Sequence, residues 1–63
     1  MEIKEIIPNL NKKVVYNESE YTLTGSTIRK DPQGRIFYQA EILDKNGNSV
    51  CIVRLEDVKC LDL

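Results

Sequence analysis

The sequence has few of the residues from which reactive sites are built. It contains no His and no Trp, and its two Cys, Cys51 and Cys60, lie apart. Structural zinc sites take four Cys or His ligands, which this chain cannot supply. No Ser or Cys lies in a nucleophile motif, and the acidic pair Glu18/Glu20 falls in a polar turn open to solvent. We therefore expect a non-enzymatic protein without a metal or a cofactor.

Glycine and long apolar runs are also scarce. The three Gly form no phosphate-binding loop motif, and no apolar run approaches the ~20 residues that cross a bilayer. The opening segment MEIKEIIPN carries acidic residues and lacks the apolar core of a signal peptide. We expect a cytoplasmic protein without membrane contact, in which the two Cys are reduced thiols rather than a disulfide.

Neither sign of charge dominates the chain. Nine Lys and Arg stand against ten Asp and Glu, which gives a net charge of −1. This balance provides no overall attraction for nucleic acid, although it is compatible with a local basic patch. The 63 residues allow one small domain. Such a domain buries only about 60% of its extended-chain surface, so it needs a closed sheet or a partner.

The clearest structural signal is a hairpin over residues 35–55. Two apolar-rich runs flank Asn46-Gly47, a pair favoured in type I′ turns because both central residues have φ > 0. This turn pairs Leu43 with Val50 and Ile42 with Cys51, and side chains alternate between faces along each strand. One face then has no charge and comprises Ile36, Tyr38, Ala40, Ile42, Cys51, Val53 and Leu55. The other is mixed and comprises Phe37, Gln39, Glu41, Leu43, Val50, Ile52 and Arg54.

Runs of β-branched and aromatic residues predict further strands at 13–17, 21–30 and 59–63. In the long second run the apolar residues change parity across Gly25, which indicates a β-bulge or a sharp bend. Polar residues 17–20 form a predicted turn, and residues 55–58 a short 3₁₀ turn. Asp31, Pro32 and Gly34 occupy the first, second and fourth positions of a type I turn.

Apolar residues near the start recur at helical spacing. Ile3, Ile6, Ile7 and Leu10 fall at i, i+3, i+4 and i+7, whereas Pro8 argues against a full helix. We expect one or two helical turns, or an extended arm, over residues 1–12. This arm should pack on the sheet formed by residues 13–63.

Together these elements predict an all-β fold. A five-stranded, bent antiparallel sheet closes into a small barrel, which removes exposed strand edges, and a short N-terminal helical turn or arm precedes it. The predicted core comprises Val14 or Val15, Leu23, Ile28, Ile36, Tyr38, Ala40, Ile42, Cys51, Val53, Leu55 and Val58.

Two short motifs resemble Tudor-type domains. Residues 37–42, FYQAEI, resemble their "aromatic, Tyr, x, Ala, x, aliphatic" strand, and residues 53–58, VRLEDV, resemble the strand that runs into a 3₁₀ turn. The element order over residues 13–61 is similar to that of Src-homology-three-like small barrels, which include Tudor, KOW and Agenet modules. The resemblance implies a fold rather than a function. Tudor domains that bind methylated Lys or Arg use an aromatic cage, whereas the aromatic residues here are Tyr16, Tyr21, Phe37 and Tyr38.

The first candidate site is the apolar part of the mixed hairpin face: Phe37, Leu43, Val50 and Ile52. The favoured interpretation is that the N-terminal arm covers this face as a second small core. Otherwise the face binds a partner protein or a second copy of the chain, because contiguous exposed apolar patches are uncommon on monomers. The leading hypothesis is a protein-interaction module. The Ile-, Lys- and Asn-rich composition and small size suggest an accessory protein of a bacterium or of its mobile elements.

The alternative function is nucleic-acid binding. With residues 31–34 as the turn, Lys30 opposes Arg35 and Arg29 opposes Ile36, and like charges across a ladder are mildly destabilising. A bound phosphate would relieve this repulsion. The favoured interpretation is that these side chains instead extend into solvent and pair with Asp31 or other acids. The predicted nucleic-acid contacts are Lys12, Lys13, Arg29, Lys30 and Arg35.

Overall fold

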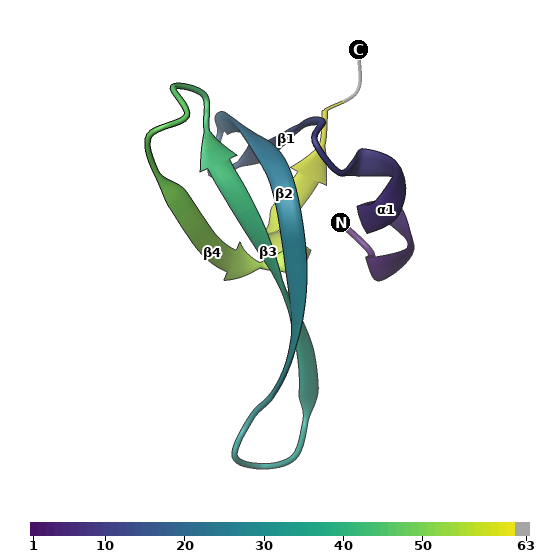
Figure 1. The fold of residues 1–63 in the computed structure, drawn as a ribbon. Coiled ribbons are helices and arrows are strands. Elements are labelled where there is room, and N and C mark those ends of the chain that lie inside the picture. Colours follow the sequence, from purple (N-terminus) through teal and green to yellow (C-terminus); the bar gives the residue numbers. More distant parts are fainter. Residues whose placement is uncertain (62–63) are drawn as a thin grey trace.

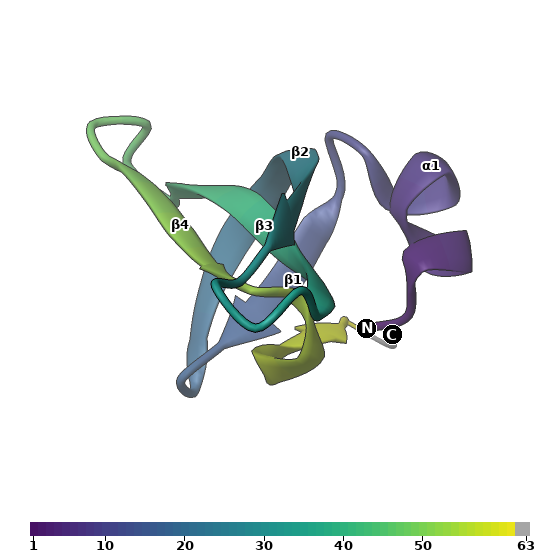
Figure 2. The ribbon, with the colours of Figure 1, turned by 90° about the horizontal axis from the view of Figure 1, so that it is seen from below.

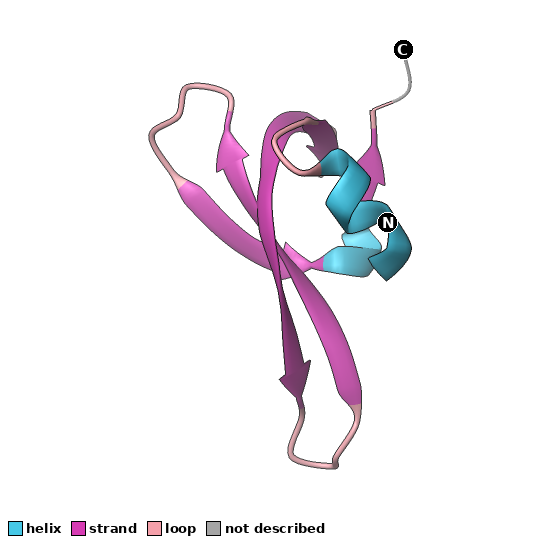
Figure 3. Ribbon diagram, turned by 45° about the vertical axis from the view of Figure 1, so that its right-hand side comes forward, coloured by secondary structure: helices cyan, strands magenta, loops and turns pink. Residues whose placement is uncertain are grey.

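The computed structural model describes residues 1–61 and contains one antiparallel sheet of five strands (Figure 1). In chain order the strands are β1 (Lys13–Tyr16), β2 (Ser19–Lys30), β3 (Ile36–Asp44), β4 (Val50–Arg54) and β5 (Val58–Cys60). A 3₁₀ turn, η1 (Ile3–Glu5), leads into the single helical turn α1 (Ile6–Asn9), and η2 (Leu55–Asp57) joins β4 to β5 (Figure 3). The predicted all-β class, five strands and short N-terminal helical turn are confirmed.

The sheet is open within the described residues. Its strand order is β4-β3-β2-β1-β5, so β4 and β5 are the two end strands. Closing the barrel would require these two strands to pair along their lengths. β5 has only three residues, and all three pair with β1. The sheet is therefore not closed into the barrel that the sequence predicts.

The core is small and lies between the inner face of the sheet and the segments α1 and η2. The buried apolar residues are Ile6, Val14, Leu23, Ala40, Ile42, Leu55 and Val58. Except for Ile6, all were predicted as core, and Cys51 and Val53 pack against the same cluster while half-buried. The uncharged face of the β3–β4 hairpin is therefore the inner face of the sheet, as alternation predicted.

The β2–β3 hairpin continues beyond this core as a two-stranded ribbon, at the bottom of Figure 1. Residues 36–38 of β3 pair with β2 but not with β4, because the β3–β4 ladder ends at Gln39 opposite Arg54. The predicted core residues Ile28, Ile36 and Tyr38 lie on this ribbon and are 66%, 59% and 36% exposed. Placing these residues in the core was wrong, because no second layer of the described chain buries them.

The β3–β4 register is the predicted one, but its turn is of a different type. Leu43 pairs with Val50 and Ile42 with Cys51. Gly47 has φ +72°, whereas Asn46 does not have positive φ, and the Gly47 N–H donates to the Asp44 carbonyl at 3.0 Å. This geometry is a type I turn with Gly in last position. The loop of residues 45–48 is thus longer than the predicted two-residue turn, but it gives the same pairing of β3 with β4.

The type I′ conformation occurs in the first hairpin instead. Asn17 and Glu18 have φ of 51° and 66°, and they directly join the paired residues Tyr16 and Ser19. β2 therefore begins two residues earlier than predicted, at Ser19 rather than Tyr21. The predicted irregularity at Gly25 is confirmed, since the pairing register shifts between Leu23 and Gly25.

The ribbon turn has the predicted type I positions, but its loop is one residue longer than a type I turn alone would give, because Gly34 remains unpaired in the strand ladder. The Asp31 N–H donates to the Arg35 carbonyl and the Gly34 N–H to the Asp31 carbonyl, each at 2.9 Å, and Gly34 has φ +86°. A type I turn followed by a left-handed Gly is the common three-residue hairpin loop. Lys30 consequently opposes Ile36, so the predicted opposition of Lys30 and Arg35 is wrong.

Candidate functional site

The N-terminal arm packs on the inner face of the sheet. Ile6 is buried in the cluster that contains Ala40 and Ile42, and β2 holds the arm through its backbone. The Asn11 N–H donates to the Leu23 carbonyl at 2.7 Å, and the Leu23 N–H donates to the Lys12 carbonyl at 3.0 Å. Figures 1 and 2 show α1 and β4 on opposite sides of the molecule. The interpretation that the arm covers the outer face of the hairpin is therefore wrong.

The outer face of β3 and β4 is left uncovered by this packing. Val50 and Ile52 are each 52% exposed, and Leu43 is half-buried. Leu43 opposes Val50 across the ladder, and Ile52 opposes Glu41. These three apolar residues, which we call the outer patch (Leu43, Val50 and Ile52), adjoin one another as the sequence predicted.

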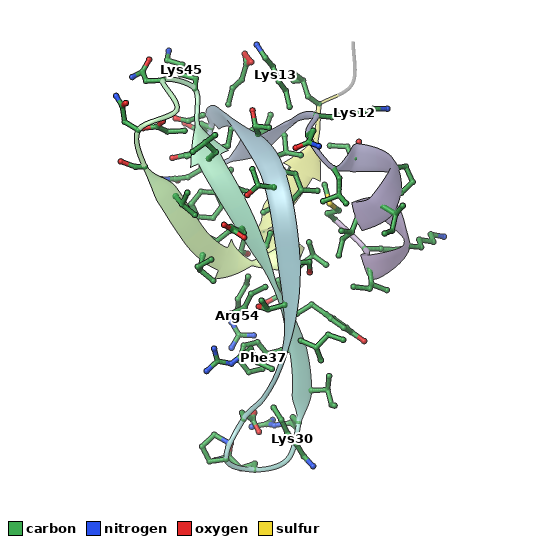
Figure 4. All side chains as sticks on the ribbon, in the orientation of Figure 1. Lys12, Lys13, Lys30, Phe37, Lys45 and Arg54 are labelled. Carbon is green, nitrogen blue, oxygen red and sulfur yellow. The ribbon has the colours of Figure 1, made fainter. Side chains whose placement is uncertain are left out.

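Phe37 belongs to a different part of the same face. The Gln39–Arg54 pair separates it from Ile52, and the Arg54 guanidinium carbon lies 4.7 Å from the centre of the Phe37 ring (Figure 4). This distance is typical of a cation–π contact. Sequence analysis missed this contact, although the correct register already placed Arg54 diagonal to Phe37 on one face.

The predicted basic residues do not form one surface. Lys12 and Lys13 lie at the end of the molecule opposite Lys30, which lies near the tip of the ribbon (Figure 4). Lys13 forms an exposed ion pair with Glu20 at 3.7 Å. Arg29 opposes Phe37 across the β2–β3 ladder. Lys12 and Lys13 therefore lie apart from the predicted contacts on the ribbon, which are Arg29, Lys30 and Arg35. Arg54, which was not predicted as a contact, lies beside the ribbon at Phe37.

Arg35 is held by the turn that it closes. Its Nε lies 3.3 Å from Oδ2 of Asp31, and its backbone N–H donates to Oδ1 of Asp31 at 2.9 Å. One carboxylate thus neutralises one of the predicted phosphate contacts. From the sequence, pairing of the basic side chains with Asp31 or other acids was favoured over phosphate binding, and for Arg35 the structure shows the pair with Asp31.

The aromatic residues lie in two separate places. Tyr16 and Tyr21 meet edge to face with ring centres 6.0 Å apart. Phe37 and Tyr38 are neighbours on one strand and therefore face opposite sides of the ribbon. This arrangement does not bring the four rings into one cage.

A polar cluster joins the arm to the end of β5. The Cys60 thiol donates to Oε2 of Glu5 at 3.4 Å, and the Asn9 amide donates to the Cys60 sulfur at 3.7 Å. The Glu2 backbone N–H donates to Oε1 of Glu5 at 2.7 Å. This N–H, and secondarily the Cys60 thiol, lowers the pKa of Glu5 from its usual range. Within residues 1–61, no group of three or more His, Cys, Asp and Glu side chains is arranged to hold a metal ion.

A groove of about 570 Å³ lies between the arm and the base of the ribbon, with Ile3, Ile36 and Tyr38 among its lining residues. Its carboxylates occur in exposed ion pairs: Glu2 lies 3.4 Å from Lys4, and Glu56 lies 3.9 Å from Arg54.

The helices of the described chain are too short and too polar to cross a bilayer. No protein-family model, curated protein or solved structure matches the chain.

Proposed function

We propose that the chain is a non-enzymatic protein-interaction module whose contact surface is the outer patch. The observation that carries this proposal is the position of the arm. Ile6 packs into the inner core, so Val50 and Ile52 keep half of their surface exposed beside half-buried Leu43. Apolar side chains next to one another on a sheet face are typical of the centre of a binding surface.

The residues around the outer patch fit this role. Glu41 opposes Ile52, and Arg54 is the next residue of β4 on the same face. Both are polar groups at the border of an apolar centre, which is the usual layout of a protein interface. A partner or a second copy of the chain would bury the patch and supply part of the apolar burial that a chain this small lacks.

Two further proposals concern the fold and the setting. We infer an Src-homology-three-like, Tudor-type architecture, supported by the strand order β4-β3-β2-β1-β5 and by the 3₁₀ turn η2 between the last two strands. We also propose a cytoplasmic accessory protein of a bacterium or its mobile elements, for which the support is composition and small size.

Photo-crosslinking tests the protein-binding proposal. A photoreactive residue in place of Val50 should capture a defined protein in cells of the source organism, whereas the same residue in place of Ile7 should not. Ile7 is a matched control because it is 77% exposed and lies on the arm. The captured protein, once purified, should bind the chain about tenfold more weakly after Ile52→Asp, since an interface centre carries most of the binding energy. Unchanged binding would refute the assignment of the outer patch.

Nucleic-acid binding by the ribbon is the second candidate. The observation that favours it is the alignment of Arg29, Phe37 and Arg54 on one face, with Arg54 4.7 Å from the Phe37 ring. Cationic side chains beside an aromatic ring are the elements from which proteins build surfaces for single-stranded nucleic acid.

Salt dependence separates the two candidates. If the ribbon binds single-stranded nucleic acid, the binding constant should fall with a log–log slope of about −0.7 per phosphate contact. Arg29→Ala should then reduce the slope, and Lys12→Ala, at the other end of the molecule, should not. Binding of a protein at the outer patch should instead depend less on salt than nucleic-acid binding does, because its apolar contacts release no counterions.

A further inference from the structure

The edge of the sheet formed by β4 is open to a further strand. β4 is an end strand, and in Figures 1 and 2 no other element within residues 1–61 runs along its outer side. Its residues 50–53, VCIV, contain no charge, no Pro and no Gly. Edge strands in natural proteins are usually protected by such residues or by being very short. The opposite edge follows this rule, since β5 has three residues and includes Lys59.

The hydrogen-bond pattern of the hairpin shows which groups face outward. The Asp44 N–H donates to the Ser49 carbonyl at 2.9 Å, so this pair is hydrogen-bonded. Hydrogen-bonded and non-bonded pairs alternate along an antiparallel ladder. The alternation directs the backbone N–H and C=O groups of Val50, Ile52 and Arg54 away from β3. The same three residues carry their side chains on the outer face.

We propose that β4 binds an extended segment of a partner protein as an additional strand. This inference rests on the proposed protein-binding function and specifies how the partner binds. The outward backbone groups would supply hydrogen bonds, and Val50 and Ile52 would select alternating apolar or β-branched residues of the segment. The segment would also carry a carboxylate for Arg54, whose own ion pair with Glu56 is long, at 3.9 Å, and exposed.

Charge argues for such a segment over a second copy of the chain. Antiparallel pairing of two β4 strands about Ile52 would place Arg54 of each copy opposite Val50 of the other. Parallel pairing in register would place the two Arg54 side chains next to each other. Neither arrangement provides a carboxylate opposite Arg54, and like charges across a ladder are destabilising. A segment of another protein that carries acidic residues can place a carboxylate opposite Arg54 whether it pairs with β4 in the parallel or the antiparallel direction.

Amide hydrogen exchange of the full chain tests the proposal. The probe is a capped synthetic peptide of alternating Val and Thr with Glu at both ends, and the control peptide has Lys in place of Glu. At a concentration about ten times its dissociation constant, the Glu peptide should slow exchange at Val50, Ile52 and Arg54 about tenfold. Cys51 and Val53, which already pair with β3, should be protected both with and without the peptide. The Lys peptide should bind about tenfold more weakly.

Two variants complete the test. Ile52→Pro removes an outward N–H that β3 does not use, so the sheet should form while the Glu peptide no longer binds. Ile52→Lys should also prevent binding, whereas Ile7→Lys, the same change on the arm, should not. The amide spectrum of each variant shows whether it is folded.

Each other result overturns the proposal. Absence of peptide binding, unchanged binding to folded Ile52→Pro, or peptide binding that leaves exchange at Val50, Ile52 and Arg54 unchanged would each exclude strand addition. Slowed exchange that appears with rising protein concentration, without peptide, would identify a second copy as the occupant. A partner that crosslinks at position 50 but does not slow exchange at Val50, Ile52 and Arg54 would leave the protein-binding function intact and refute only strand addition.

Discussion

Replacing Ile6 tests how the arm is attached to the sheet. Ile6 is the one residue of η1 and α1 that is buried, with 6% of its surface exposed, and the adjacent Ile7 is 77% exposed. Ile6→Ala removes three carbon groups, whose transfer from water contributes about 2.4 kcal/mol. The cavity that remains raises the expected loss to about 3 kcal/mol, toward the lower end of the range for such changes because the arm can settle into the space.

This loss is large for so small a domain. At ~0.1 kcal/mol per residue, the 63 residues should have an unfolding free energy of about 6 kcal/mol, so Ile6→Ala would remove about half of it. With a urea m-value of about 1 kcal/mol/M, the unfolding midpoint should fall by about 3 M. Ile7→Ala makes the same chemical change on the exposed side and should alter the unfolding free energy by less than about 0.5 kcal/mol.

Urea unfolding of both variants, followed by circular dichroism, measures the difference. Amide exchange adds a local test, because the Asn11 N–H is bonded to the Leu23 carbonyl and should exchange faster only in Ile6→Ala. Similar midpoints for the two variants would refute the conclusion that Ile6 attaches the arm to the core.

The remaining predictions concern turns, the bulge and pH. Glu18→Gly should stabilise the fold by about 1 kcal/mol in thermal unfolding, because Glu18 has φ 66° and a left-handed backbone is unfavourable for residues with a Cβ. Gly47→Ala, at φ +72°, should destabilise it by about the same amount for the same reason. Gly25→Ala should change stability by less than about 1 kcal/mol, since the new Cβ would lie 3.0 Å from Oε2 of Glu41, a side-chain end that can move. The lowered pKa of Glu5 means that its ionised form stabilises the fold at neutral pH, and this contribution is lost as the pH falls below 4.5. Glu5→Gln should therefore lower the urea midpoint at pH 7 and make little difference in acid; an equal loss at both pH values would contradict this linkage.

Local signals in the sequence correctly predicted the register of the β3–β4 hairpin and the bulge in β2, but not the register of the β2–β3 ribbon. The parity change across Gly25 correctly indicated the bulge, and Asn46-Gly47 correctly indicated a turn that pairs Leu43 with Val50. The type of that turn was wrong without affecting the register, because loops of different lengths can close the same pairs. The outer patch could therefore be predicted, because the β3–β4 pairing, and not the loop conformation, decides that its three residues share one face.

What covers each face could not be predicted from alternation or helical spacing. Alternation correctly put Ile36 and Tyr38 on one face with Ala40, but only Ala40 lies where the arm and η2 close over the sheet. Helical spacing likewise grouped Ile6 with Ile7, although one is buried and the other exposed. Periodicity gives the direction of a side chain, and burial depends on which distant segment packs against it.

The single-residue difference in the ribbon turn has a consequence for function. With a three-residue loop, Arg29 opposes Phe37 instead of Ile36 and moves to the outer face. That face then changes along its length, from the apolar outer patch near the β3–β4 loop to Arg54 at the base of the ribbon (Figure 4) and, farther along the ribbon, Arg29 opposite Phe37. A segment added beside β4 would pass from apolar contacts to Arg54 and the cationic end. The two candidate surfaces are thus neighbouring parts of one face that share Arg54, and an extended partner with apolar residues followed by acidic ones matches both.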